Sequence, residues 1–373
     1  MTDVSPRARR VFDDAVVIDA HNDLPTKILD DAYDAALRHH PGFAPHEGET
    51  DVPRLVESGI AGQFLTAFVD AKYAGRSPDE SFARAVAAID AIHGLVAAHP
   101  DALVFSTTAE EIESAKRNGR VAVCIGVEGG HAIESSIDKL RDLYRRGARY
   151  MGLTWNNGND WAGSSVGLDG TRTGGLTALG VEIVREMNRL GMFVDVSHVS
   201  DATFDDVLAT SVAPVIASHS SARAIDPAPR NLADDQIRAV ARSGGVVNVN
   251  FYAPFVDASF FAEKTRIEQM VADEVAPERR EGRAKELVRR IPLPPLAVLI
   301  DHIDHVARVA GIDHVGLGSD FDGVSGLLPV GMNEVTRLPW LVDPLFARGY
   351  GDDDVKKILG GNMLRVMRRV LDR

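Results

Sequence analysis

Short apolar runs alternate along the chain with longer stretches whose apolar residues recur at helical spacing. The apolar runs have the length of buried strands, and they lie at residues 16–20, 62–70, 121–127, 150–154, 192–196, 214–217, 245–250 and 315–318. The amphipathic stretches lie at residues 78–99, 109–118, 136–146, 177–190, 201–208, 234–242, 295–310 and 352–371. Strands that alternate with helices predict a parallel sheet. About eight such units in one chain of this length favour a closed (β/α)8 barrel, the TIM barrel of the α/β class, over an open sheet.

Two segments depart from this alternation. Residues 24–53 are rich in Asp, His, Pro and Gly and predict a long polar loop. Residues 258–290 carry dense charges of both signs, with Pro277 and Gly282 among them, and predict a helical insertion after the seventh strand. We expect the insertion to be a solvated surface appendage, and a partial lid or a dimer contact is the alternative. Because residues 1–373 show no linker or repeat, a single barrel domain is predicted.

Composition and charge narrow the choice of partners. The 373 residues carry a net charge of −13, which argues against nucleic acid and anionic membranes, because both attract basic surfaces. The only cysteine, Cys124, cannot form an internal disulfide, and its setting in VAVCIGV predicts a buried, inert thiol. No apolar run reaches the roughly 18–20 residues of a membrane-spanning helix, and no secretory signal follows MTDVSPRARR. We therefore expect a cytoplasmic protein without a membrane partner, and a homodimer is left open.

Polar residues with metal-binding side chains stand where the apolar runs stop. They are His21, Asp23, Glu128, His198, His219 and Asp320. His21 and Asp23 are two residues apart, so both side chains point to the same side of an extended backbone. A parallel barrel brings the carboxyl ends of all its strands to one face, where barrel active sites lie. Imidazole nitrogens and carboxylate oxygens are ligands of zinc and similar divalent ions, so this set predicts a metal site.

The candidate ligands are too numerous for a single ion. Three histidines and three carboxylates exceed the needs of one tetrahedral zinc. They suit two ions, about 3.5 to 4 Å apart, that share a bridging carboxylate. Glu128 is the natural bridge, because it leaves a strand that lies between the two groups of ligands. No lysine ends a predicted strand, so a carboxylated-lysine bridge is not expected, and His131 in EGGH is expected to orient its neighbours rather than bind metal.

Eight motifs lie in order along almost the whole chain. They are IDAHNDLP (18–25), IGVEGGH (125–131), VDVSHVS (194–200), ASHSSAR (217–223), RNLADD (230–235), VNFY (249–252), GSDFDG (318–323) and GGNMLRV (360–366). This series resembles the membrane dipeptidase family, also called renal dipeptidase. The resemblance implies an amidohydrolase-like barrel and a zinc-dependent dipeptidase that cleaves dipeptides with a metal-bridging hydroxide. It also implies that His21 and Asp23 hold one zinc. His198 and His219 would hold the other zinc, and Glu128 would bridge the two.

The resemblance also implies roles for residues outside this ligand set. Asp320 is the implied proton shuttle near the first zinc, and Arg230 is the implied partner of the substrate's C-terminal carboxylate. Without the resemblance, Arg230 in PAPRNLADD would be an ordinary surface arginine. The chain departs from the family at Trp155, where many members have the histidine of LTHS, which helps to bind the scissile carbonyl. Either the Trp155 N–H or Asn156 is expected to supply that hydrogen bond, in a tighter and more apolar pocket.

Two other functions fit the same residues. Another amidohydrolase-type reaction, on a cyclic amide, a lactam or an acyl amino acid, would use the same metals. A non-catalytic metal- or ligand-binding protein would keep the ligands but has no need of a proton shuttle such as Asp320. A dipeptidase with two zinc ions per chain and a dipeptide as its small-molecule substrate is therefore the main hypothesis. The family implies that the C-terminal residue of the substrate can be L or D.

Overall fold

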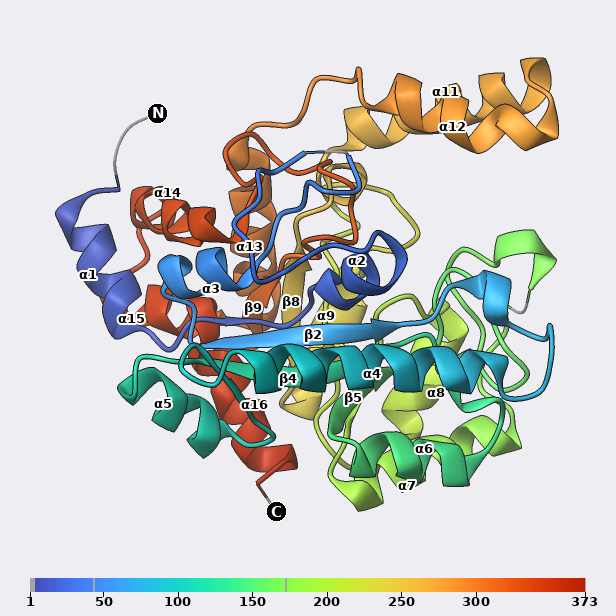
Figure 1. The fold of residues 1–373 in the computed structure, drawn as a ribbon, viewed down its shortest axis with the longest axis horizontal. Coiled ribbons are helices and arrows are strands. Elements are labelled where there is room, and N and C mark those ends of the chain that lie inside the picture. Colours follow the sequence, from blue (N-terminus) through green and yellow to red (C-terminus); the bar gives the residue numbers. More distant parts are fainter. Residues whose placement is uncertain (1–3, 43, 172, 373) are drawn as a thin grey trace.

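The strands form a closed parallel barrel (Figure 1). The computed structural model describes residues 4–42, 44–171 and 173–372. Within them the barrel strands are β1 (Ile18–Asp19), β2 (Gly62–Phe68), β4 (Val121–Glu128), β5 (Ala148–Gly152), β6 (Phe193–Asp195), β7 (Ile216–Ala217), β8 (Val246–Asn250) and β9 (Val315–Gly318). Neighbours follow the order β2-β1-β9-β8-β7-β6-β5-β4, and a β2–β4 pairing closes the ring. The predicted (β/α)8 barrel is confirmed.

One further strand lies outside the ring. β3 (Leu103–Phe105) pairs with the first half of β4, in the register Leu103↔Val121. The second half of β4 pairs with β5. β3 and β5 therefore occupy the same edge of β4, one beside each half of the strand. The sequence did not predict β3, because three residues are too few to show a hydrophobic period.

Side chains that alternate along β4 enter two different cores. Every residue of β4 is buried. Val123 and Ile125 belong to the apolar layer that the outer helices cover, whereas Ala122 and Cys124 belong to the layer that contains Tyr150. Strands buried on both faces are typical of parallel barrels, and this explains why the runs are almost continuously apolar. Cys124 is a free, buried thiol, as predicted, and burial raises its pKa above the usual value.

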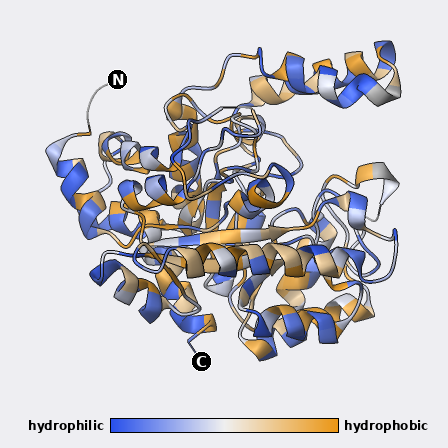
Figure 2. Ribbon diagram, viewed as in Figure 1, coloured by the Kyte–Doolittle hydropathy of each residue, from blue (hydrophilic) through white to orange (hydrophobic). Residues whose placement is uncertain are grey.

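Helices cover the outside of the barrel at nearly all the predicted positions. They are α4 (Glu80–Ala98), α5 (Ala109–Arg117), α6 (Ile137–Arg145), α7 (Ala178–Leu190), α8 (Asp201–Thr210), α9 (Asp234–Ser243) and α13 (Leu296–Ala310). Figure 2 shows hydrophobic colour along β2 and the adjacent α4, and hydrophilic colour on much of α6 and α7. The buried residues of α4 and α6 include Ile89, Ile92, Leu140 and Leu143, so the apolar stripes turn toward the barrel.

The segment predicted as a polar loop at 24–53 contains helix instead. α2 (Leu24–Asp30) starts directly after the first strand, and α3 (Val52–Ser58) starts at the end of the segment. The side chain of Asp51 accepts a hydrogen bond from the backbone N–H of Arg54, and Pro53 occupies the first turn of α3. A further helix, α1 (Pro6–Asp14), was also not predicted. With 7 residues each, α2 and α3 are too short for their hydrophobic period to stand out.

The C-terminal helix predicted at 352–371 is interrupted. It consists of α15 (Asp352–Lys356), the π-helical segment η6 (Lys357–Gly361) and α16 (Asn362–Val370). The break falls at Gly360, where a Cβ would lie 2.1 Å from the backbone oxygen of Val16. A glycine is therefore required where this helix passes the first strand.

The expectation that no stretch is long and apolar enough to span a membrane was wrong for one helix. Among the described residues, α4 has the length and the apolar composition of a membrane-spanning helix. In the structure its buried residues include Ala85, Ile89 and Ile92, and the helix packs against β2 and α2. Its apolar side is thus part of the barrel core.

The charged segment at 258–290 contains two helices, α11 (Ala258–Glu274) and α12 (Pro277–Val288). They lie side by side and reach away from the barrel at the top of Figure 1. Phe260, Ile267 and Val271 form a small apolar cluster of their own, to which Leu327 also belongs. The assignment of one barrel domain with an insertion here stays a prediction.

Candidate metal centre

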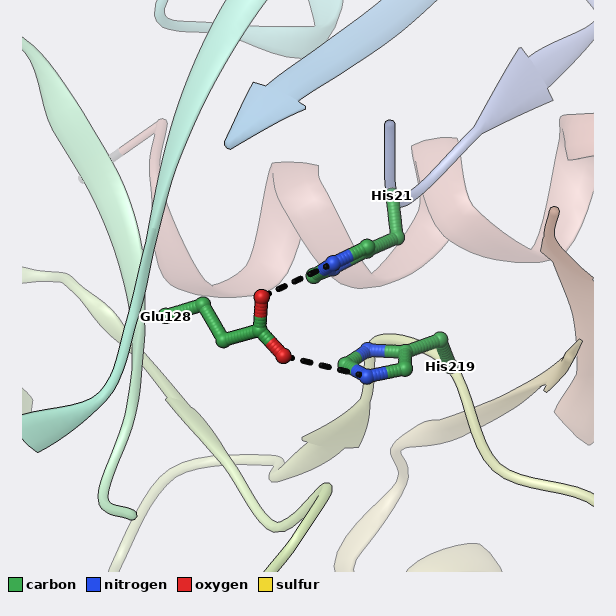
Figure 3. A group of neighbouring side chains, drawn as sticks. All are labelled: His21, Glu128 and His219. Carbon is green, nitrogen blue, oxygen red and sulfur yellow. Dashed lines mark ion pairs between the residues drawn. The ribbon is translucent and has the colours of Figure 1, made fainter. Parts of the chain in front are cut away.

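Three ligand-type side chains from distant parts of the sequence meet at the carboxyl ends of the strands. His21 follows β1, Glu128 ends β4 and His219 follows β7, and their ligand atoms lie within 4.8 Å of one another. Figure 3 shows the Glu128 carboxylate between the two rings, with one oxygen turned to each. Oε2 is 3.4 Å from His21 Nε2, and Oε1 is 3.5 Å from His219 Nε2. Glu128 thus occupies the central place that the sequence predicted for a bridge.

His198 completes this group. Its Nε2 lies 2.7 Å from Glu128 Oε1 and 2.9 Å from His219 Nε2. Burial, with the positive charge of Arg230 adding to it, lowers the pKa of His198 to about 4. Burial also holds the pKa of His219 well below its ordinary value. Both imidazoles are therefore neutral at pH 7, which is the form that binds metal.

The Nδ1 atom of each histidine lies against a neighbouring polar group. The pairs are His21 with the Tyr150 hydroxyl at 2.9 Å, His198 with Asn156 Oδ1 at 3.2 Å and His219 with Ser218 Oγ at 2.8 Å. Such contacts fix the tautomer and orientation of metal-binding histidines. The Ser218 hydroxyl donates its single hydrogen to Asp195, at 2.6 Å, so it can only accept from His219. Asn156 Oδ1 can likewise only accept.

These hydrogen bonds leave lone pairs facing one another. With the protons on Nδ1, the Nε2 atoms of His198 and His219 are both acceptors, although they lie only 2.9 Å apart. A carboxylate oxygen of Glu128 lies beside them. Three acceptors at such distances repel one another unless a cation lies among them. This arrangement fits a divalent metal ion with nitrogen and oxygen ligands.

A second group of ligands consists of His21, Asp23 and Asp320, whose ligand atoms also lie within 4.8 Å of one another. His21 Nε2 and Asp23 Oδ1 are buried and have no hydrogen-bond partner among the described residues. At Gly323 a Cβ would lie 2.2 Å from Asp23 Oδ2 and 2.4 Å from Asp320 Oδ1, so only glycine leaves room for both carboxylates. Two close carboxylates beside an imidazole acceptor fit a second cation.

Asp320 has the properties of a proton-transfer group. Burial, with the nearby negative charge of Asp23 adding to it, raises its pKa to about 7. Asn250, at the end of β8, donates a hydrogen bond to Asp320 Oδ2 at 2.8 Å. Sequence reasoning missed Asn250, although it stands at a strand end like the proposed ligands. Asp320 also has a positive φ of 64°, which is uncommon outside glycine and typical of functional sites.

Two buried aspartates hold the loops that carry the ligands. Asp195 of β6 accepts hydrogen bonds from the backbone N–H and the hydroxyl of Ser218, at 2.8 and 2.6 Å. Asp19 of β1 accepts the same pair from Ser319, at 2.8 and 2.6 Å. Each aspartate ties its strand to the loop after the neighbouring strand. The residues that follow the two serines, His219 and Asp320, are thereby placed over the barrel mouth.

Arg230 is buried beside the metal centre, contrary to the surface position its local sequence would suggest. It is 4% exposed, and its guanidinium donates long hydrogen bonds to Ser220 Oγ at 3.4 Å and to the His219 carbonyl at 3.2 Å. Burial lowers its pKa to about 10, so it stays charged at pH 7. No carboxylate within the described ranges lies at ion-pair distance from it. A buried guanidinium without a carboxylate at ion-pair distance is a ready site for an anionic group.

Trp155 and Asn156, where the chain departs from the family motif, have different neighbours. The ring of Trp155 packs edge-on against Phe68, with centroids 5.0 Å apart, and is half-buried. Asn156 lies against His198, as described above, through its Oδ1. His131 lies outside both ligand groups, and its Nδ1 lies 3.4 Å from the amide nitrogen of Asn157.

The fold and this site define a metal-dependent hydrolase of the barrel type. A model of the family described as "Membrane dipeptidase (Peptidase family M19)" matches residues 5–372, and the chain therefore belongs to this family. A dipeptidase named verJ from Clonostachys rogersoniana is 35% identical over an alignment that covers 97% of this chain and 86% of that protein.

Solved structures share the fold of this chain. The crystal structure of the probable dipeptidase PvdM from Pseudomonas aeruginosa has a TM-score of 0.87 at 24% identity, and the match covers 99% of this chain and 100% of that one. A metallopeptidase from Rhodobacter sphaeroides, liganded with a phosphinate mimic of the dipeptide L-Ala-D-Ala, has a TM-score of 0.76 at 27% identity, with 96% and 100% covered. The protein is a metal-dependent dipeptidase, as predicted, and the other amidohydrolase reactions are not favoured.

Proposed function

We propose that this dipeptidase works with two divalent ions, zinc being the expected metal. His21 and Asp23 would hold one ion, and His198 and His219 the other. The observation that carries the proposal is the cluster of acceptor atoms around Glu128, whose two carboxylate oxygens face different histidines. Ions bound there would lower the pKa of a shared water and polarise the scissile carbonyl.

The side chains around this centre handle the proton and the substrate. Asp320 takes a proton from the attacking water and returns it to the leaving amine, and its place beside His21 and Asp23 suits both steps. The hydrogen bond from Asn250 holds the carboxylate in place. Arg230 binds the terminal carboxylate of the substrate with its buried guanidinium. This contact selects short peptides with a free C-terminus.

The departure at Trp155 changes the shape of the site more than its chemistry. Because Asn156 uses its carbonyl oxygen to orient His198, we propose a supporting role for it in place of the substrate contact expected from the sequence. The ring of Trp155, packed on Phe68, forms an apolar wall beside the substrate. The metals and Asp320 are sufficient for hydrolysis without the family histidine.

The substrate set includes dipeptides with a C-terminal D-residue. Support comes from the Rhodobacter sphaeroides relative, whose bound mimic carries D-Ala in that position. The cytoplasmic location, the lack of membrane and nucleic-acid partners and the homodimer left open by the sequence stay predictions.

A dipeptide library with L- and D-residues at the C-terminus tests the function. Protein stripped with a chelator should be inactive, and it should regain activity as zinc approaches two equivalents per chain. Glu128→Gln keeps the size of the side chain and removes its charge, so this variant should lose metal and activity together. Acyl amino acids, lactams and cyclic amides form the comparison panel. Hydrolysis of that panel without any dipeptide cleavage, or full activity with one equivalent of zinc, would contradict the proposal.

A further inference from the structure

Tyr150 is a polar side chain buried inside the barrel, with its hydroxyl beside the proposed ligand His21. It is fully buried, and it belongs to the inner apolar layer, where its ring lies 5.5 Å from that of Phe64. Its hydroxyl lies 2.9 Å from His21 Nδ1 and 3.3 Å from Thr66 Oγ1. The phenol therefore connects β5 with residues that belong to β2 and follow β1.

The register of the barrel strands makes this connection geometrically possible. Thr66, Gly126 and Tyr150 are direct neighbours across β2, β4 and β5. A Cβ at Gly126 would lie 1.9 Å from Cζ of the tyrosine ring. The ring thus crosses over β4 at the one position of that strand where no side chain stands in its way. The location of the hydroxyl is set by packing, before any metal binds.

The direction of the hydrogen bonds follows from the need of His21 to bind a cation. Nε2 of His21 faces Glu128 and Asp23 and has no hydrogen-bond partner among the described residues. A cation there requires the lone pair of Nε2, so the proton must be on Nδ1. Nδ1–H then donates to the Tyr150 oxygen, and the phenol donates its own hydrogen to Thr66 Oγ1.

We propose that Tyr150 is a positioning residue that holds His21 in the Nδ1–H tautomer and in the ring orientation needed for the ion shared with Asp23. The inference rests on the proposed two-ion centre. Its effect is confined to one ion, because His198 and His219 have separate partners in Asn156 and Ser218. Tyr150 sets the affinity of this ion without touching substrate or metal.

Calorimetric titration of zinc into chelator-stripped protein tests the proposal. Tyr150→Phe keeps the ring and removes only the hydroxyl. Loss of such a partner typically weakens metal binding by about 10- to 100-fold. We expect this loss in one of two binding classes, with the other unchanged. His21→Ala identifies the affected class, because it should abolish the same one. Tyr144→Phe, on α6 with its ring against Arg149, is the matched control and should leave both classes intact.

Thr66→Val keeps the test decisive if Tyr150→Phe does not fold. It removes the acceptor of the phenol while the Tyr150–His21 contact remains, so it should weaken the same class by a smaller factor. Wild-type affinity for both zinc ions in folded Tyr150→Phe, or equal weakening of both classes, would overturn the proposal. So would unchanged affinities in Thr66→Val if Tyr150→Phe is unfolded. Failure of the wild-type protein to bind two ions would instead contradict the proposed function.

Discussion

The proposed contact between Arg230 and the terminal carboxylate of the substrate can be tested by removing the guanidinium. Arg230→Ala removes a charge-assisted contact worth about 1.5 to 3 kcal/mol. The expected loss in kcat/KM for dipeptides is therefore roughly 10- to 150-fold, at about 1.4 kcal/mol per decade. Dipeptide amides lack the terminal charge, so they should be poor substrates of the wild type and should lose little more. Steady-state kinetics on matched acid and amide pairs measures both effects.

The control for this variant is Arg223→Ala. Arg223 is an arginine of the same loop region, but it pairs with Asp201 at 2.8 Å near the surface. We expect its removal to leave kcat/KM within a few-fold of wild type for acids and amides alike. Equal losses for acids and amides in Arg230→Ala would show that the guanidinium supports the loop, and its proposed role would fail.

Variants of Trp155 and Asn156 test two different roles, packing against the substrate site and support of a metal ligand. Asn156→Ala removes the acceptor of His198 Nδ1–H, so we expect weaker zinc binding, by about 10-fold or more, and a parallel loss of activity at limiting zinc. Trp155→Phe keeps an aromatic ring against Phe68, and its kcat should stay within a few-fold of wild type. Zinc titration and kinetics on one dipeptide are the measurements. A large loss of kcat in Trp155→Phe, restored in Trp155→His, would return the oxyanion contact to position 155.

The sequence predicted which residues meet at the centre, because strand ends in a parallel barrel converge whatever the details of packing. It did not predict what holds them there. Tyr150 reaches His21 only because Gly126 is its neighbour in the register, and Ser218 can only accept from His219 because Asp195 takes its hydrogen. Such partnerships depend on which strands are adjacent, and no local pattern contains that information. The burial of Arg230 is hidden for the same reason.

At the scale of elements, His302 of α13 joins two loops at the carboxyl side of the barrel. Its Nδ1 accepts from the backbone N–H of Ala222 at 3.0 Å, after β7, and its Nε2–H donates to the carbonyl of Val256 at 3.0 Å, at the end of α10 (Ala253–Val256). Both contacts require the neutral ring. Burial lowers the pKa of His302 to about 4.

This arrangement predicts a loss of stability in mild acid. Above about pH 6.5, the unfolded pKa of histidine, His302 is neutral in both states and contributes no pH dependence. Between pH 6.5 and 4 the unfolded chain binds a proton that the folded protein does not. As the pH falls through this range, the free energy of unfolding therefore decreases by up to about 1.4 kcal/mol per pH unit. Urea unfolding of metal-free protein should therefore show a shallower acid slope for His302→Gln than for wild type. Identical slopes would show that this ring does not control the transition.

Element boundaries were predictable where local sequence decides them. β9 has the bounds that were predicted, because Asp313 and His314 precede this short run and Ser319 and Asp320 follow it. The C-terminal helix breaks at Gly360, because the backbone of Val16 comes within contact distance there. That contact joins the two ends of the chain, and a periodic pattern in residues 352–371 cannot reveal it.

At the scale of the whole molecule, the α11–α12 pair is attached to the barrel as a largely separate unit. The apolar cluster of these helices is separate from the barrel core, and the ion pairs of the segment include local ones such as Arg266–Glu263 at 2.7 Å and Lys285–Glu281 at 2.7 Å. Arg289 and Lys285 of this segment line a cavity of about 290 Å³ beside Glu49 and Asp322. None of the proposed metal ligands lies in α11 or α12.

Replacement of residues 258–290 by a short Gly-Ser linker should therefore leave the barrel folded and able to bind two zinc ions. Leu327, which is 7% exposed, would lose its cover, and exposure of one leucine costs about 1.5 to 3 kcal/mol. We expect a stability loss of that order, a single cooperative unfolding transition and a kcat/KM within about tenfold of wild type. Leu327→Ala in the full-length chain is the control for the lost contact. A deletion variant that binds no zinc, although it is folded, would show that the segment is part of the active site and not an appendage.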